Sequence, residues 1–193
     1  MAIAGGSGSI LSGEQNTSIT VQVNGDAAIE PNENFRVRLS AITNATTTDN
    51  LGIGTITNDD VAGINVNTTT GITTEAGGTA DFVFTLTSEP TANVTIPING
   101  YDATETSGPA SVVITPANWD TGVTLTVTGV DDTIVDGDVD NLLNTGNPSS
   151  TDPNYDALAA ADVPQLTVTN QDDDDLVIGI NIDTTTGLSL IHI

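Results

Sequence analysis

The chain has 193 residues, of which 26 are Asp or Glu and only two are Arg or Lys, so its formal net charge is −24. A surface this acidic repels nucleic acid and anionic membranes, and its self-repulsion favours the binding of cations. The chain has no cysteine and no run of about 18 apolar residues, which excludes a disulfide framework, a cysteine-based zinc site and membrane insertion by this segment.

Residues 1–60 are predicted to form the C-terminal part of a repeat. Two stretches alternate between apolar and polar residues, Ile19–Val23 and Phe35–Leu39, and a period of two predicts half-buried strands. In the second stretch the only cations of the chain, Arg36 and Arg38, fall on the outward face. We expect them to balance charge on an exposed sheet.

Residues 61–175 are predicted to form one complete repeat built of short strands. Apolar residues recur at every second position, and Gly, Pro, Asn and Asp separate the runs, which is typical of an all-β sandwich. The segment 139–157 is less regular and is predicted to be a weak strand and a long loop. Trp119 is expected to close an edge of the sandwich. The predicted inward rows are Phe82, Phe84 and Leu86; Val94, Ile96 and Ile98; Val112 and Ile114; Val123, Leu125 and Val127; and Leu166 and Val168.

Residues 176–193 are predicted to begin a further repeat. The sequence GINVNTTTG at Gly63–Gly71 returns as GINIDTTTG at Gly179–Gly187, with a period of 116 residues (179 − 63). A period of this length indicates whole domains in tandem. The tail 188–193 does not match the preceding unit. The first ten residues lack the features of a secretory signal, and we therefore expect the parent protein to start earlier.

Several motifs resemble those of Calx-β domain repeats. In residues 1–60 these are VNGDAAIEPNENFRVRL and GTITNDD. In residues 61–175 they are TTEAGGTADFVFTL, TPANWDTGVTLTVTGVDDTIVDGD, STDPNYDAL and VTNQDDDD, similar to the long variant of large bacterial surface proteins. The resemblance implies immunoglobulin-like antiparallel β-sandwich repeats in tandem, with several Ca²⁺ ions bound at one end of a repeat.

The resemblance also implies which carboxylates bind calcium. By position, the ligands in residues 61–175 are Glu75, Asp102, Asp131, Asp132, Asp136, Asp172, Asp173 and Asp174, and those in residues 1–60 are Asp26, Glu30, Asp59 and Asp60. The residues themselves favour the same ion. Adjacent carboxylates without a nearby Lys or Arg repel one another, and Ca²⁺ takes hard oxygen ligands in a flexible geometry. The alternative is that Asp and Asn only build turns between strands.

The sequence predicts a non-catalytic protein. Its one histidine, His192, lies in the non-matching tail, and without Lys or Cys the many hydroxyl groups have no obvious base. We expect a calcium-binding structural or adhesion module of a large secreted or cell-surface bacterial protein. In it Ca²⁺ would rigidify the joints between neighbouring repeats. The partners would be those repeats, and cell-surface glycans or matrix proteins are further candidates.

Two other functions remain open from the sequence. One is a carbohydrate- or matrix-binding β-sandwich in which Tyr101, Trp119 and Tyr155 form a stacking platform. The other is a calcium-sensing regulatory domain acting in cell communication. The predicted location is extracellular or at the cell surface, with the secretory signal of the parent protein outside this segment.

Overall fold

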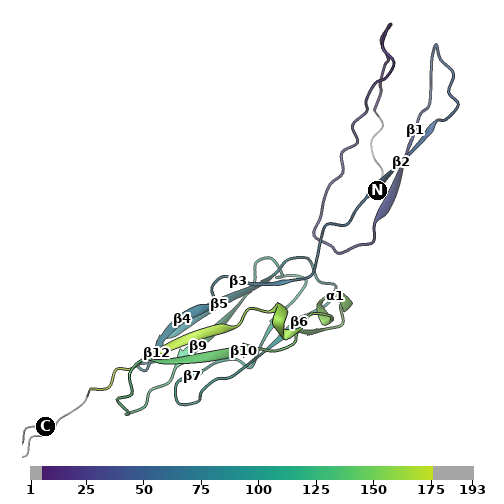
Figure 1. Cartoon of the computed structure of the whole chain (residues 1–193). Coiled ribbons are helices and arrows are strands. Elements are labelled where there is room, and N and C mark those ends of the chain that lie inside the picture. Colours follow the sequence, from purple (N-terminus) through teal and green to yellow (C-terminus); the bar gives the residue numbers. More distant parts are fainter. Residues whose placement is uncertain (1–5, 176–193) are drawn as a thin grey trace, which may run out of the picture. The chain divides into compact units, whose positions relative to one another are not determined.

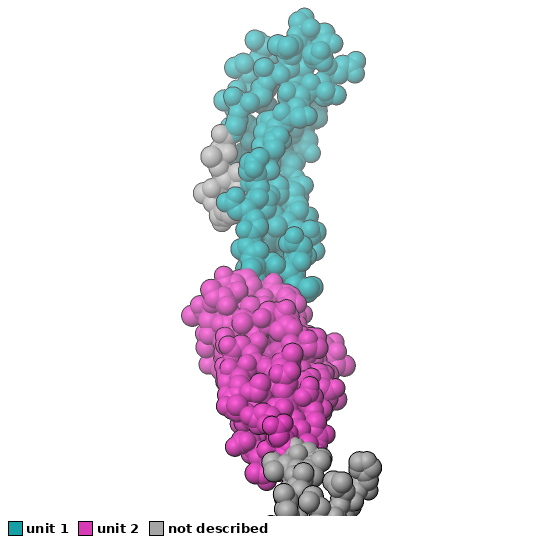
Figure 2. All heavy atoms as spheres, turned by 90° about the vertical axis from the view of Figure 1, so that its left-hand side faces the viewer, with its two compact units in different colours: residues 1–61 teal, residues 62–193 magenta. Residues whose placement is uncertain are grey.

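The computed structural model describes residues 6–175. The chain divides into two compact units, residues 1–61 and residues 62–193, coloured separately in Figure 2. The predicted start of a further repeat (176–193), with its tail 188–193, lies outside the described residues. No helix within residues 6–175 is long and apolar enough to cross a membrane.

Within residues 6–61, unit 1 forms an antiparallel hairpin of β1 (Glu33–Arg38) with β2 (Leu51–Ile56). Phe35 lies opposite Gly54, where an added Cβ would lie 2.2 Å from the aromatic ring, so glycine makes room for the ring. The predicted strand at Phe35–Leu39 is confirmed apart from its last residue, and Arg36 and Arg38 are exposed as expected. The prediction of a strand at Ile19–Val23 is wrong, because these residues form no strand in the structure. Alternation alone does not make a strand, because its backbone groups also need the hydrogen bonds of a neighbouring strand.

Unit 2 is an immunoglobulin-like β-sandwich of two sheets (Figure 1). Within residues 62–175 the strand pairs are antiparallel except β12 with β4, which is parallel. The larger sheet has the order β11 (Ser149–Ser150), β6 (Val94–Asn99), β10 (Val139–Thr145), β12 (Leu166–Gln171) and β4 (Thr70–Thr74), with β8 (Ser111–Ile114) also paired to β6. The smaller sheet has the order β3 (Ile64–Val66), β5 (Thr79–Leu86), β9 (Val123–Gly129) and β7 (Thr106–Ser107). The helical segments are the short helix α1 (Pro153–Asp156) and a 3-10 turn at Ala160–Asp162.

The core of unit 2 lies between the two sheets. The residues predicted to be buried are confirmed: each of Phe82, Phe84, Ile96, Leu125 and Val127 is at most 1% exposed. They alternate with exposed or half-buried residues along their strands, as the period of two requires. Trp119 is half-buried and packs against this core, as expected for a residue at an edge of the sandwich.

The prediction for residues 139–157 is confirmed for its strand and wrong for its long loop, since β11 and α1 lie in the predicted loop. The segment provides β10, which lies between β12 and β6 in the larger sheet. It also provides Tyr155, which is fully buried. The Tyr155 hydroxyl donates to the Ser88 carbonyl (2.6 Å) and accepts from the Ser88 N–H (3.2 Å). The sequence signal for this strand is weak because two of its inward residues, Asn141 and Thr145, are polar and interrupt the apolar alternation.

Candidate metal centre

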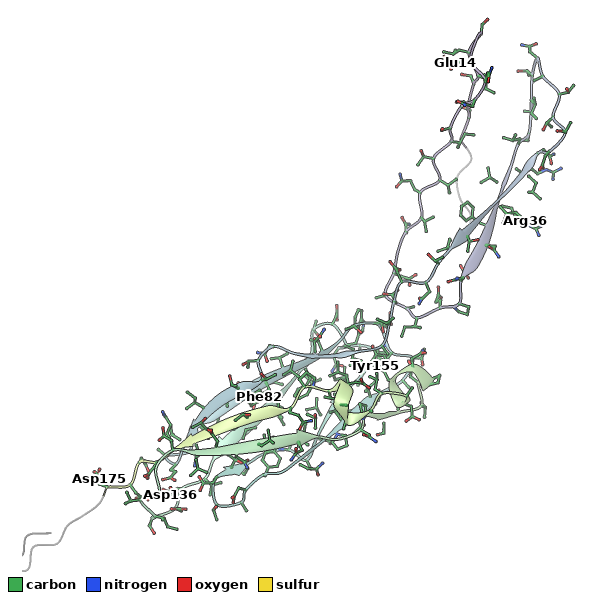
Figure 3. All side chains as sticks on the ribbon, viewed as in Figure 1. Glu14, Arg36, Phe82, Asp136, Tyr155 and Asp175 are labelled. Carbon is green, nitrogen blue, oxygen red and sulfur yellow. The ribbon has the colours of Figure 1, made fainter. Side chains whose placement is uncertain are left out.

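Four segments bring carboxylates to one end of unit 2. Glu75 follows β4, Glu105 immediately precedes β7, residues 131–136 follow β9, and residues 172–174 follow β12. The parallel pairing of β4 and β12 places the ends of both strands together, and the Glu75 N–H donates to the Gln171 carbonyl (3.1 Å). Figure 3 shows Asp136 and Asp175 at this end and Tyr155 toward the other.

The carboxylates form three groups in the part of the chain that the structure describes. Within each group, one oxygen from every member lies within 4.8 Å of the others. Glu75 and Asp136 each belong to two groups, so the groups share ligands. The groups are Glu75, Asp131 and Asp173; Glu75, Asp136 and Asp172; and Glu105, Asp132 and Asp136. We call these seven residues, together with Asp174 beside them, the acidic pole.

Burial makes the acidic pole electrostatically costly. Glu75 is 2% exposed, and burial, followed by repulsion from Asp172, Asp132 and Asp174, raises the pKa of its carboxyl. The Asp173 N–H, which donates to Glu75 Oε2 (3.4 Å), offsets this only in part. Burial and the same kind of repulsion raise the pKa of Asp174, whose Oδ2 is buried without a hydrogen-bond partner. A cation at this place would relieve both effects.

Backbone hydrogen bonds fix the loops of the acidic pole. The Asp172 carboxylate accepts from the Gly137 N–H (2.8 Å) and from the Asp174 N–H (2.9 Å). Asp132 accepts from the Ile134 N–H (2.7 Å) in a local turn. These bonds hold residues 131–137 against the end of β12, and they leave other carboxylate oxygens free to bind a cation.

The structure brings together six of the eight residues predicted in this unit within the three groups, and Asp174 lies next to them. The exception is Asp102, which belongs to none of the groups. Its carboxylate accepts from the Thr104 hydroxyl (2.7 Å) and the Thr104 N–H (3.1 Å), and these bonds lower its pKa. The same loop contributes Glu105 instead, which is 4% exposed and which sequence reasoning missed. The spacing Asp102-x-Thr104 is typical of an Asx turn and was a signal that Asp102 bonds locally.

The four residues predicted in unit 1 form no group of three carboxylates within residues 6–61. Asp26 accepts from the Ala28 N–H (3.0 Å), as in a turn. Asn58 connects two of the others through their backbones, because it accepts from the Glu30 N–H (3.1 Å) and donates to the Asp60 carbonyl (2.8 Å). Asp59 is exposed. Binding of calcium by unit 1 remains a prediction.

The aromatic residues do not form a stacking platform. Tyr155 is fully buried, which contradicts its predicted role in sugar stacking. Tyr101 is half-buried, its hydroxyl donates to the Pro109 carbonyl (3.0 Å), and burial raises its pKa to about 12. Trp119 packs against the core. A carbohydrate ligand stacked on these rings is therefore disfavoured.

Comparison with protein-family models gives no match, and comparison with curated proteins gives none either. Among solved structures, the chain is similar to the apo form of the Calx CBD1 domain, at 15% identity and a TM-score of 0.41, covering 60% of this chain and 100% of that chain. It is also similar to CBD12 from CALX1.2, at 15% identity and 0.40, covering 57% and 45%. A third match is the calcium binding domain CBD12 of CALX1.1, at 13% identity and 0.41, covering 78% and 71%. Identities this low say nothing about ligands, and the bacterial variant of the family stays a prediction.

Proposed function

We propose that unit 2 is a non-catalytic module that binds Ca²⁺ at the acidic pole. The observation that carries the proposal is the convergence of carboxylates from four chain segments into three groups that share ligands. No Lys or Arg occurs in residues 62–193 to neutralise them. Like charges this close strain the fold, and a bound cation removes the strain.

Calcium suits this arrangement better than magnesium. Ca²⁺ takes six to eight oxygen ligands in a flexible geometry, whereas Mg²⁺ demands a near-octahedral shell and retains its water molecules. The groups combine buried Glu75 and Glu105 with more exposed aspartates, so backbone carbonyls and water can complete the coordination. Because Glu75 and Asp136 are shared, more than one ion fits the pole, with a bridging carboxylate between neighbouring ions.

We further propose a mechanical role, which the position of the pole supports. Asp172–Asp174 directly follow β12, at the point where the chain continues toward the predicted next repeat. Ions held there would fix the start of the linker to residues 131–137. We propose that unit 2 is a spacer or adhesion repeat of a large secreted or cell-surface bacterial protein, and that its partners are the neighbouring repeats.

The test is thermal unfolding of the full chain in CaCl₂ and in NaCl of equal ionic strength, with MgCl₂ as a further arm. A discrete site occupied at ten times its dissociation constant stabilises the folded state by about 1.4 kcal/mol, which shifts the melting temperature measurably. The double variant Asp131→Asn/Asp132→Asn should lose the shift. The matched control is Asp120→Asn, an exposed aspartate in the turn before β9, at the opposite end of that strand from the pole, which should keep it. Equal stabilisation by CaCl₂ and NaCl contradicts the proposal.

A further inference from the structure

The inward face of β12 ends in a polar residue. Leu166 and Val168 are fully buried apolar residues, and Asn170, the next inward position, is 1% exposed. An amide at this depth destabilises the fold unless its donors and acceptors are satisfied, so a purely structural position would favour another aliphatic residue. The hydrogen-bond partners of Asn170 therefore indicate why this position has an amide side chain.

Asn170 bonds to three separate segments. Its Nδ2 donates to Glu105 Oε2 (3.3 Å) and to the Val130 carbonyl (3.3 Å), the residue directly before the Asp131-Asp132 pair. Its Oδ1 accepts from the Thr73 hydroxyl (2.9 Å) on β4. The Thr73 bond orients the amide so that its NH₂ faces the carboxylate. Thr73, Glu105 and Val130 all lie close to the acidic pole, near the end of β4, before β7 and after β9.

The neighbouring backbone is shaped to admit this side chain. Gly129, the last residue of β9, has no Cβ, and an added one would lie 2.5 Å from Asn170 Oδ1 and 2.2 Å from the Thr74 carbonyl oxygen. Any larger residue would push Asn170 out of place. The observed position of the Asn170 side chain therefore requires a glycine at the end of β9.

The same residue occurs at the same place in the sequence of unit 1. The end of β2 and the two residues after it read Thr55-Ile56-Thr57-Asn58, and β12 contains Thr167-Val168-Thr169-Asn170. Asn58 also bonds to the preceding acidic loop of its own unit, by accepting from the Glu30 N–H (3.1 Å). An Asn at this sequence position therefore bonds to the preceding acidic segment in both units, although Asn58 is exposed and lies two residues beyond β2.

We propose that Asn170 is a positioning residue for calcium binding, which holds Glu105 and the start of the 131–136 loop in the geometry of the Glu105, Asp132 and Asp136 group. This rests on the proposed function of the pole. A neutral amide suits the task, because it donates to Glu105 without neutralising it. A Lys would satisfy the carboxylate and exclude the ion, whereas an Asp would repel it. Outer partners of this kind typically change metal affinity 10- to 100-fold when they are lost.

The experiment is a calorimetric titration of the full chain with CaCl₂, well below the melting temperature. Asn170→Leu should weaken binding at least tenfold at one class of site. Thr73→Val, which removes only the orienting hydroxyl, should weaken the same class less, and Thr73→Ser should restore it. The control is Thr145→Val, which removes a buried hydroxyl of β10 that donates to the Val163 carbonyl (3.3 Å), in the same sheet but away from the pole.

The outcomes separate this inference from the proposed function. Unchanged affinities and stoichiometry in Asn170→Leu and Thr73→Val, beside a parent chain that binds calcium, overturn the role of Asn170 alone. An equal loss in Thr145→Val also overturns it, because the loss would then follow from lowered stability. A parent chain that takes up no calcium overturns both. If Asn170→Leu does not fold, the Thr73→Val and Thr73→Ser pair decides.

Discussion

Replacing Glu75 by Gln should have opposite effects on the metal-free and the calcium-bound protein. Glu75 is 2% exposed and is surrounded by carboxylates, so the neutral amide should make the metal-free fold more stable. The same change removes a charged ligand from two of the three carboxylate groups. Calcium binding should therefore weaken while the metal-free form gains stability.

The size of the effect follows from linkage. If the dissociation constant rises about tenfold, then at a calcium concentration of ten times the parent constant the calcium-dependent gain in unfolding free energy falls to about 0.3 of that of the parent chain. Chemical unfolding with and without calcium measures both quantities. The matched control is Glu89→Gln, at an exposed glutamate between β5 and β6. This substitution should change neither the stability of the metal-free protein nor the calcium-dependent gain.

The pH dependence of the metal-free protein provides an independent check. The pKa of Glu75 is raised in the folded state, so the folded protein binds more protons than the unfolded chain as pH rises from the ordinary value to the raised value. Stability should fall across that window, and Glu75→Gln should reduce the fall. Asp174 should contribute in the same direction. A variant that is less stable than the parent without calcium, or that keeps the full calcium response, would refute this reasoning.

Three further predictions concern the fold and the joint. Tyr155→Phe should lower the free energy of unfolding by about 1–3 kcal/mol, because the buried polar groups of Ser88 lose their partner; chemical unfolding measures this, and an unchanged stability would contradict it. Gly129→Ala should destabilise unit 2 by about 1–3 kcal/mol through the clash with the Thr74 carbonyl, and a fold as stable as the parent's would show that the end of β9 can shift. In a chain of two complete repeats, calcium should lengthen and stiffen the particle in small-angle scattering, and changing Asp172–Asp174 to Asn should abolish that response; stiffening that persists would reduce the joint to a solvated linker.

The sequence alone was sufficient to predict the strands whose inward residues are all apolar. The alternation in β5, β6, β8 and β9 appears as buried and exposed positions in the structure. The clustering of Asp at the ends of strands likewise pointed to the acidic loops. Both are local signals, because each depends only on residues a few positions apart.

Other features depend on contacts between residues that are far apart in the sequence, and only the tertiary structure revealed them. Ile19–Val23 alternates but forms no strand, whereas β10 is an internal strand although the inward Asn141 interrupts its pattern. Glu105 joins Asp132 and Asp136 because β7 and β9 are neighbours, and Asn170 reaches it from the other sheet. The sequence therefore determined the strand faces and the acidic character of the loops. The fold decided which carboxylates meet and which amide holds them, because burial and pairing depend on the partners that packing supplies.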